Sequence, residues 1–163
     1  MDEDAFDEFY RTSFNRLVGQ IYAMCGNLSE AQDAVQEAFI RAWDHRRQLD
    51  ETRDPEAWVR TTAYRLSVSR WRKATKAFRQ PDRVLEVPLS NEPNPDQILI
   101  NRALAQLPEA QRQAIVLHHL CDMTVEDVAR EVGSPSGTIK ARLVRGRETL
   151  ARLLHSEREY RHA

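Results

Sequence analysis

The sequence predicts an all-α protein made of two small helical domains joined by an extended linker. Only 5 of its 163 residues are glycine while 30% are charged, a composition that favours helices over sheets and tight turns. Apolar residues recur at spacings of three and four along most of the chain, and no stretch alternates as a strand would. Three prolines interrupt this pattern within residues 80–94 and predict the linker. We therefore expect helical domains at residues 1–79 and 95–163, each with a modest core.

The N-terminal domain is expected to contain three helices. The first is an amphipathic helix at residues 4–25 that ends at Gly26 and Asn27. Ser29 and Gln32 form a capping box for the second, which continues as far as a polar loop. The inward positions expected on these two helices are Phe6, Phe9, Tyr10, Phe14, Leu17, Val18, Ile21 and Met24, then Val35, Ala38, Phe39, Ala42 and Trp43.

The polar loop occupies residues 48–55 and leads into a long third helix. Asp54 supplies the N-cap and Pro55 the first turn of this helix. Neither glycine nor proline interrupts it before Arg79, so we expect it to continue to that residue.

Charge is strongly segregated along the chain, although the formal net charge is only −1. Residues 1–56 contain six basic and thirteen acidic residues, whereas residues 57–81 contain seven basic residues and no acidic one. Residues 82–134 are acidic again, and residues 135–163 carry seven basic residues against three acidic ones. Two basic blocks alternating with acidic ones predict two separate surfaces that face polyanions.

The basic third helix also carries aromatic residues. Tyr64, Trp71 and Phe78 lie seven residues apart and therefore share one side, where they interleave with arginines. Aromatic rings among cations bind unpaired bases by stacking, which duplex DNA does not require. A core position is the alternative for an aromatic stripe at helical spacing, and we assign Trp58 to the core.

The C-terminal domain is expected to contain four helices. Asn94 and Pro95 open the first of them and Pro108 opens the second. The expected inward positions are Ile98, Leu99, Leu104 and Leu107 on the first, then Ala114, Ile115, Leu117 and Leu120 on the second.

The last two helices have the pattern of a helix-turn-helix. Thr124 caps the first together with Asp127, and Gly133 closes it. Ser134 and Pro135 then provide the N-cap and the first turn of the second helix. The apolar positions are Val125, Val128, Ala129 and Val132 on the first helix, and Ile139, Leu143, Gly146, Leu150 and Leu153 or Leu154 on the second.

The outward face of the second helix is suited to a DNA major groove. Ile139 marks the buried side, and each residue turns the helix by about 100°. The opposite side consists of Gly137, Ala141, Val144, Arg145 and Glu148, flanked by Lys140 and Arg147. A solvated charged face is the alternative, but the caps, the small residues and the basic helix coincide within one short segment.

A polar stripe runs along the second helix of the N-terminal domain, beside its apolar face. It consists of Asp33, Gln36, Glu37 and Arg41. Such a stripe is usually a solvated face, and its position alone assigns no function to it.

Three segments together resemble the bacterial extracytoplasmic-function sigma factors of the sigma-70 family. They are DAVQEAFIRAW at residues 33–43, DPEAWVRTTAYRL at residues 54–66 with its basic continuation, and LPEAQRQAIVLHHLCDMTVEDVAREVGSPSGTIKARLVRGRETL at residues 107–150. The resemblance covers nearly the whole chain, in the order and separation that the family shows. It implies sigma region 2 at residues 1–79 and sigma region 4 at residues 95–163.

The resemblance implies a subunit that directs core RNA polymerase to promoter DNA. The polar stripe would dock on the β′ clamp helices, with the β subunit as a further partner, and the implied contacts are Asp33, Gln36, Glu37 and Arg41. Residues 48–55 and the start of the third helix would capture a flipped base of the melted −10 element, whose other implied contacts are Arg60, Tyr64, Arg65, Arg70, Trp71, Arg72 and Lys73. The −35 element would be read as duplex by Ser136, Gly137, Thr138, Lys140, Ala141, Val144, Arg145 and Arg147, chiefly by Lys140, Ala141, Val144 and Arg145.

Two residues of the third helix depart from the family pattern. Arg65 stands where the family usually has asparagine and Ser69 where it usually has aspartate, so the usual −10 base preference does not carry over. We expect no further domain after the helix-turn-helix. Control by a separate anti-sigma protein is compatible with the sequence but leaves no trace in it.

Enzymatic and metal-binding functions are not expected. The five glycines form neither a P-loop nor a dinucleotide fingerprint, and no serine, histidine and acid trio stands out, so we expect no cofactor and no small-molecule substrate. His118 and His119 are adjacent and diverge on a helix, so with Cys121 they are not expected to chelate a metal. Cys25 and Cys121 are the only two cysteines in the sequence, too few for a disulfide scaffold. The sequence shows no signal peptide and no membrane-spanning run, so we expect a cytoplasmic protein.

Two other functions compete with the sigma-factor interpretation. One is a helix-turn-helix repressor or activator that acts without being a polymerase subunit and uses its N-terminal helices to dimerise or to sense a signal. The other is a polymerase-binding protein without sequence preference. A dimeric repressor has no use for a second cationic helix rich in aromatic residues, so the sequence favours a sigma factor.

Overall fold

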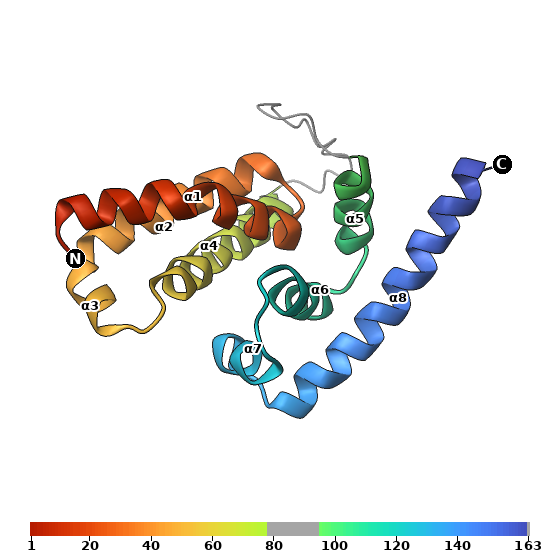
Figure 1. The fold of residues 1–163 in the computed structure, drawn as a ribbon. Coiled ribbons are helices and arrows are strands. Elements are labelled where there is room, and N and C mark those ends of the chain that lie inside the picture. Colours follow the sequence, from red (N-terminus) through yellow and green to blue (C-terminus); the bar gives the residue numbers. More distant parts are fainter. Residues whose placement is uncertain (78–94, 163) are drawn as a thin grey trace. The chain divides into compact units, whose positions relative to one another are not determined.

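The computed structural model describes the backbone of residues 1–77 and 95–162, and the side chains of these residues except 71–77 and 161. Every element in these ranges is a helix, which confirms the predicted all-α class (Figure 1). Within them, no helix combines the length and the apolar character needed to cross a bilayer. The expected linker at residues 80–94 and the last two positions of the expected third helix lie outside the described residues.

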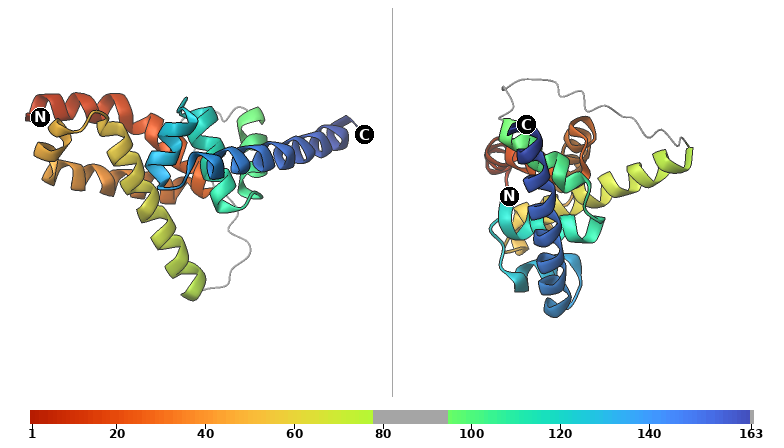
Figure 2. Two further views of the ribbon diagram at one scale, coloured as in Figure 1. Left: turned by 90° about the horizontal axis from the view of Figure 1, so that it is seen from below. Right: turned by 90° about the vertical axis from the view of Figure 1, so that its right-hand side faces the viewer.

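The chain divides into two compact units, Met1–Val87 and Pro88–Ala163, called unit 1 and unit 2 below. Unit 1 contains three long helices that contact one another pairwise, and α3 connects the second to the third. Its helices are α1 (Glu3–Cys25), α2 (Leu28–Asp44), α3 (Arg46–Glu51) and α4 (Pro55–Ala77). Figure 2 shows that α4 starts beside α1 and α2 and then extends away from them.

An aromatic cluster joins α1 to α2 and forms much of the unit 1 core. The Phe6 ring lies 6.2 Å from that of Phe39 and 5.1 Å from that of Trp43, both in edge-to-face geometry. Tyr10, an expected inward residue, lies 5.0 Å from Phe39 but remains partly exposed at the rim. The other expected inward positions of α1 and α2 are buried or half-buried.

The connection between α1 and α2 is shorter than expected. Gly26 ends α1 in the left-handed conformation, with φ 77°, and the side chain of Asn27 accepts a hydrogen bond from the Glu30 amide at 3.0 Å. Asn27 is therefore the N-cap of α2, and the expected capping box of Ser29 and Gln32 is wrong. A left-handed glycine followed by an extended asparagine closes one helix and opens the next without a separate loop.

Part of the expected polar loop is the short helix α3. Its one apolar residue, Leu49, is 1% exposed and belongs to the core. A single apolar residue among polar ones gives no periodic signal, which is why the sequence predicted a loop here. The predicted start of the next helix is confirmed, because Asp54 Oδ1 accepts a hydrogen bond from the Ala57 amide at 3.1 Å.

Unit 2 is organised around its long last helix, which contacts three of the preceding elements. The elements are α5 (Pro95–Ala105), α6 (Glu109–Ile115), the π-helical turn η1 (Val116–Leu120), α7 (Val125–Val132) and α8 (Ser136–His162). Its fully buried large side chains include Leu104, Leu117, Val128, Ile139 and Leu143.

The π-helical turn η1 changes which residues face the core. Val116 and Leu117 are buried, whereas Leu120 is 40% exposed, so the expected inward position of Leu120 is wrong. A π-turn holds one residue more than an α-turn, which rotates the following side chains by about 100° relative to a regular helix. Leu120 lies at the end of this turn and is among the rotated side chains.

The helix-turn-helix has the expected caps with one difference. Thr124 accepts a hydrogen bond from the Asp127 amide at 3.1 Å, and Gly133 closes α7 with φ 71°. The carbonyl of Pro135, rather than that of Ser134, accepts the first hydrogen bonds of α8, so α8 begins one residue later than predicted. The Ser134 hydroxyl instead accepts from the Arg142 guanidinium at 3.5 Å.

Gly146 lies at a close contact between α8 and α6. A Cβ atom at this position would lie 2.9 Å from Cγ1 and 3.2 Å from Cδ1 of Ile115, which is closer than carbon atoms normally approach. Glycine at this point therefore allows the backbone of α8 to pack directly on a buried side chain of α6.

Candidate nucleic-acid interface

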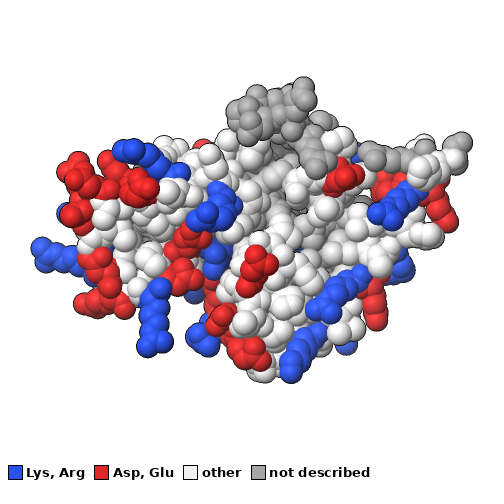
Figure 3. All heavy atoms as spheres, in the orientation of Figure 1, with Lys and Arg blue, Asp and Glu red and all other residues white. Residues whose placement is uncertain are grey.

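The outward face of α8 is displayed to solvent as predicted. Ile139 and Leu143 are buried against the rest of unit 2, whereas the residues on the opposite side are exposed. The exposed members of the predicted −35 set are Ser136, Gly137, Lys140, Ala141, Val144, Arg145 and Arg147, and Thr138 is half-buried. Val144 is 52% exposed and contributes apolar surface to this face. Figure 3 shows basic side chains along α8 and acidic ones at the end of unit 1 that holds the N-terminus.

Arg147 is held by a residue outside the helix-turn-helix. Its Nε donates a hydrogen bond to Nε2 of His119 in η1 at 3.2 Å. His119 is exposed overall, but its partial burial lowers its pKa, and the nearby charges of His118 and Arg147 lower it further. The sequence prediction treated the two histidines only as an unsuitable metal site and did not connect them with α8.

The predicted −10 contacts of α4 fall into three groups. Arg60 is only 5% exposed, so burial excludes it as a direct contact to DNA in this structure. Tyr64 and Arg70 are half-buried, and Arg65 is exposed. The side chains of the remaining members, Trp71, Arg72 and Lys73, lie outside the described residues.

A hollow between α2 and α4 collects several of these side chains. Trp58, which the sequence assigned to the core, is half-buried and lines this hollow, with the His45 ring 5.8 Å away and tilted by 36°. The hollow combines an aromatic ring, cations and small polar groups, which suits a base and its phosphate. Its lining residues are Glu37, Arg41, His45, Trp58, Thr62, Arg65, Leu66, Ser69 and Arg70.

The polar stripe of α2 surrounds an exposed apolar residue. Asp33, Gln36 and Arg41 are exposed, and the partly exposed Glu37 accepts a hydrogen bond from Arg41 Nε at 3.3 Å. Ile40 lies among them and is 55% exposed, although the sequence analysis did not select it. The signal was available, because Ile40 is apolar and lies off the apolar face of α2. A second hollow is lined by Glu30, Asp33, Gln36, Glu37, Ile40 and Arg70.

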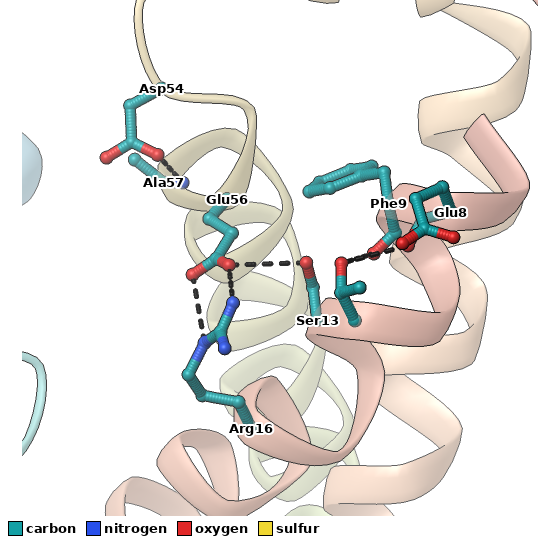
Figure 4. A network of polar contacts seen from close by, with 8 residues as sticks. Glu8, Phe9, Ser13, Arg16, Asp54, Glu56 and Ala57 are labelled. Atoms are coloured by element: carbon teal, nitrogen blue, oxygen red, sulfur yellow. Dashed lines mark hydrogen bonds and ion pairs between the residues drawn. The ribbon is translucent and has the colours of Figure 1, made fainter. Parts of the chain in front are cut away.

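A polar network fixes the start of α4 against α1 (Figure 4). The hydroxyl of Ser13, which is buried, donates to Glu56 Oε1 at 3.2 Å. Arg16 donates from Nε to Glu56 Oε2 at 3.4 Å and forms an ion pair through Nη2 with Oε1. The hydrogen bond and charge of Glu56 raise the pKa of Arg16 above its ordinary value. The network positions the turn before α4, which carries the residues expected to capture a flipped base.

Both units match families of known proteins. Residues 9–77 match the family model for sigma-70 region 2, and residues 97–150 match the model for sigma-70, region 4. The chain is 28% identical to the ECF RNA polymerase sigma factor SigW of Bacillus subtilis, over 94% of this chain and 90% of that protein. It is 31% identical to the ECF RNA polymerase sigma factor EcfG of Rhodopseudomonas palustris, over 82% of this chain and 76% of that one.

A solved structure shows the same fold. It is the sigma factor RpoE of Bartonella quintana in complex with the anti-sigma factor NepR, and it is 26% identical with a TM-score of 0.77, over 93% of this chain and 97% of that one. Along this chain the region 2 match precedes the region 4 match. The protein therefore belongs to the extracytoplasmic-function RNA polymerase sigma factors of the sigma-70 family.

Proposed function

We propose that this sigma factor binds core RNA polymerase, reads the −35 element as duplex DNA with α8, and holds the melted −10 element on α4. One observation carries the proposal: a single chain combines an exposed reading face on a capped helix-turn-helix with a separate aromatic and cationic hollow. Duplex and unpaired DNA require these different surfaces. Catalysis belongs to the polymerase in this proposal, and the protein acts in the cytoplasm where promoters and polymerase meet.

The −35 contact combines charged and apolar recognition. Arg145 and Lys140 present donors that suit guanine O6 and N7 or phosphate oxygens. Ala141 and Val144 present methyl groups that suit thymine C5-methyl groups. Ser136, Gly137 and Thr138, in the first turn of α8, offer backbone and hydroxyl donors to a phosphate.

The −10 contact uses the hollow between α2 and α4. Trp58 lines the hollow with an aromatic surface, and Arg65 and Arg70 provide cations for the phosphate backbone. Arg65 and Ser69 replace the asparagine and aspartate that are usual in the family, so the hydrogen-bond donors in this hollow differ from the usual ones. We therefore expect this protein to prefer a different −10 base. Arg60 takes no direct part, because its side chain is buried.

Docking on the polymerase uses the polar stripe of α2. An exposed apolar side chain ringed by polar groups is the usual arrangement of a binding hot spot, and Ile40 among Asp33, Gln36, Glu37 and Arg41 has that form. The β′ clamp helices are the proposed partner of this surface and the β subunit a further one. Because a solved relative is in complex with an anti-sigma factor, we also include an anti-sigma protein among the proposed partners.

Transcription in vitro with purified core polymerase tests the proposal. A pool of promoter fragments with randomised −35 and −10 elements is transcribed with core enzyme alone and with core enzyme plus the protein. We expect initiation only with the protein, and enrichment of defined bases in both elements. If the protein instead binds a duplex site tightly by itself and adds no initiation, it is a helix-turn-helix repressor or activator.

Charge reversal on α2 provides a separate test of docking. Asp33→Arg introduces a cation beside Ile40. We expect it to weaken association with core polymerase at least tenfold, because a charge buried in the interface beside a like charge, or without a partner, costs more than about 1.4 kcal/mol of binding free energy. Asp7→Arg makes the same charge change on an exposed position of α1 and serves as the control. The affinities are measured by fluorescence anisotropy at fixed ionic strength. Equal affinities of the two variants would show that the stripe is an ordinary solvated surface with no role in docking.

A further inference from the structure

Unit 2 carries two adjacent histidines beside its reading helix to which the proposed function assigns no role. The rings of His118 and His119 lie 4.8 Å apart in edge-to-face geometry. His118 Nδ1 donates to the carbonyl of Met123 at 2.7 Å and so ties η1 to the turn before α7. His119 accepts the hydrogen bond from Arg147 Nε at 3.2 Å. The turn η1 is thus connected through one hydrogen bond to a proposed DNA contact.

This hydrogen bond requires a neutral imidazole. The guanidinium of Arg147 can only donate, so Nε2 of His119 must carry a lone pair, and the single ring proton lies on Nδ1. The pKa of His119 is lowered below its ordinary value by burial and by the charges of His118 and Arg147. The accepting form of His119 therefore predominates at pH 7.

The charged groups around His119 do not favour its protonation. Among the described residues, His118 from η1 and Arg147 from α8 are the groups that act on its pKa. Charged residues of the neighbouring helices, such as Arg112 of α6 and Glu126 of α7, are not among them. Protonation would place a positive charge next to the Arg147 guanidinium and remove the acceptor.

We propose that His119 is a positioning residue that fixes the direction in which the Arg147 guanidinium meets the −35 element. The inference rests on the proposed function, because it requires that Arg147 contact DNA. An unrestrained arginine loses rotamer freedom on binding, whereas one already held by a hydrogen bond loses less. The bond is made through Nε, so both terminal NH₂ groups remain available to phosphate or guanine.

Specific recognition then depends on pH in a defined direction. Above the ordinary pKa of histidine His119 is neutral and Arg147 is held. As the pH falls through the lowered pKa of His119, the hydrogen bond is lost and Arg147 is repelled. The imidazolium also adds a cation that attracts any phosphate. Discrimination between the −35 element and random duplex should therefore fall on acidification, even where binding to random duplex does not.

The test compares binding to a −35 duplex and to a scrambled duplex, at pH values between about 5.5 and 8 and fixed ionic strength. The full chain is reconstituted with core polymerase. His119→Ala removes the acceptor and is expected to lower the ratio of the two affinities roughly three- to fivefold at neutral pH. His119→Gln keeps a neutral acceptor, so its ratio should stay close to that of the wild type at pH 8 and remain constant at lower pH. His155→Ala removes an exposed histidine of α8, the helix that carries Arg147, and serves as the control.

A double-mutant cycle with Arg147→Ala separates positioning from a general structural effect. In that background His119→Ala should cause no further loss of discrimination. A loss that persists without Arg147, or a wild-type ratio that His119→Ala leaves unchanged, would overturn the inference while leaving the proposed function intact. If the wild-type complex shows no preference for the −35 duplex at any pH, the proposed function fails and the inference fails with it.

Discussion

At the scale of single residues, the reading face of α8 mixes two kinds of recognition. Lys140 and Arg145 provide charged donors, while Ala141 and Val144 provide apolar surface that is exposed in the free protein. An exposed valine on a DNA-facing helix loses hydration favourably when it meets a thymine methyl group. We therefore expect the −35 element to be defined by thymine methyl groups as well as by hydrogen bonds.

Arg145→Ala tests the charged part of this recognition. We expect it to reduce discrimination at one −35 base pair by about 1 to 3 kcal/mol, because a bidentate arginine contact carries roughly that specificity. Arg152→Ala removes the same charge from an exposed position of the same helix and should reduce affinity for all sequences equally. The measurement is competitive binding of holoenzyme to a set of single-base −35 variants. Equal losses on specific and random DNA for Arg145→Ala would contradict its role in reading bases.

Burial is the property of single residues that the sequence could not supply. Arg60 and Arg65 belong to the same basic helix, yet Arg60 is buried and Arg65 is exposed. Charge and spacing select both, because only the packing of α1 and α2 on α4 decides which of them reaches solvent. Ile40 shows the opposite case, an apolar residue that packing leaves exposed. Residues of either kind need the tertiary structure to be assigned.

At the scale of elements, periodicity and capping signals predicted the long helices and the short α6 and α7, but not α3 or η1. The four helices with several apolar turns begin within a residue or two of the prediction, since capping residues and apolar stripes mark them. The short helix α3 and the π-turn η1 were missed. A helix with one buried leucine has no period, and a π-turn is stabilised by the surrounding packing rather than by a local sequence signal.

The network at Glu56 makes a prediction about how α4 is attached to α1. Glu56→Ala leaves the buried Ser13 hydroxyl without its acceptor and is expected to destabilise unit 1 by about 1 to 3 kcal/mol. Glu56→Gln keeps an acceptor for Ser13 and loses only the ion pair with the exposed Arg16, so its cost should stay below about 1 kcal/mol. Urea unfolding followed by tryptophan fluorescence measures both, and similar losses in the two variants would assign the stability to the ion pair instead.

At the scale of the whole molecule, the two units have separate cores, and their unfolding can be followed by different spectroscopic signals. All three tryptophans, Trp43, Trp58 and Trp71, belong to unit 1. Tryptophan fluorescence therefore follows the unfolding of unit 1 alone, whereas circular dichroism follows the helices of both units. Compact units with their own cores are expected to unfold as separate cooperative transitions.

Gly146→Ala should destabilise unit 2 without affecting unit 1. The added Cβ overlaps Ile115, and overpacking of about 1 to 3 kcal/mol exceeds the roughly 1 kcal/mol that alanine gains over glycine in a helix. Gly137→Ala, in the same helix, meets no atom within 4 Å and should instead be stabilising by about 0.5 to 1 kcal/mol. The circular dichroism midpoint in urea should move in opposite directions for the two variants, with an unchanged fluorescence midpoint. A fluorescence shift in Gly146→Ala would show that the units are coupled.

The tight connection at Gly26 and Asn27 has a consequence for the order of events during synthesis. Helices α1 and α2 close on each other over only two residues, at a small entropic cost, and both leave the ribosome before α4. The acidic N-terminal hairpin can thus form before the cationic residues 57–81 emerge. Those cations, which attract ribosomal RNA, would then emerge after an oppositely charged hairpin has folded, and this hairpin would compete with the RNA for them.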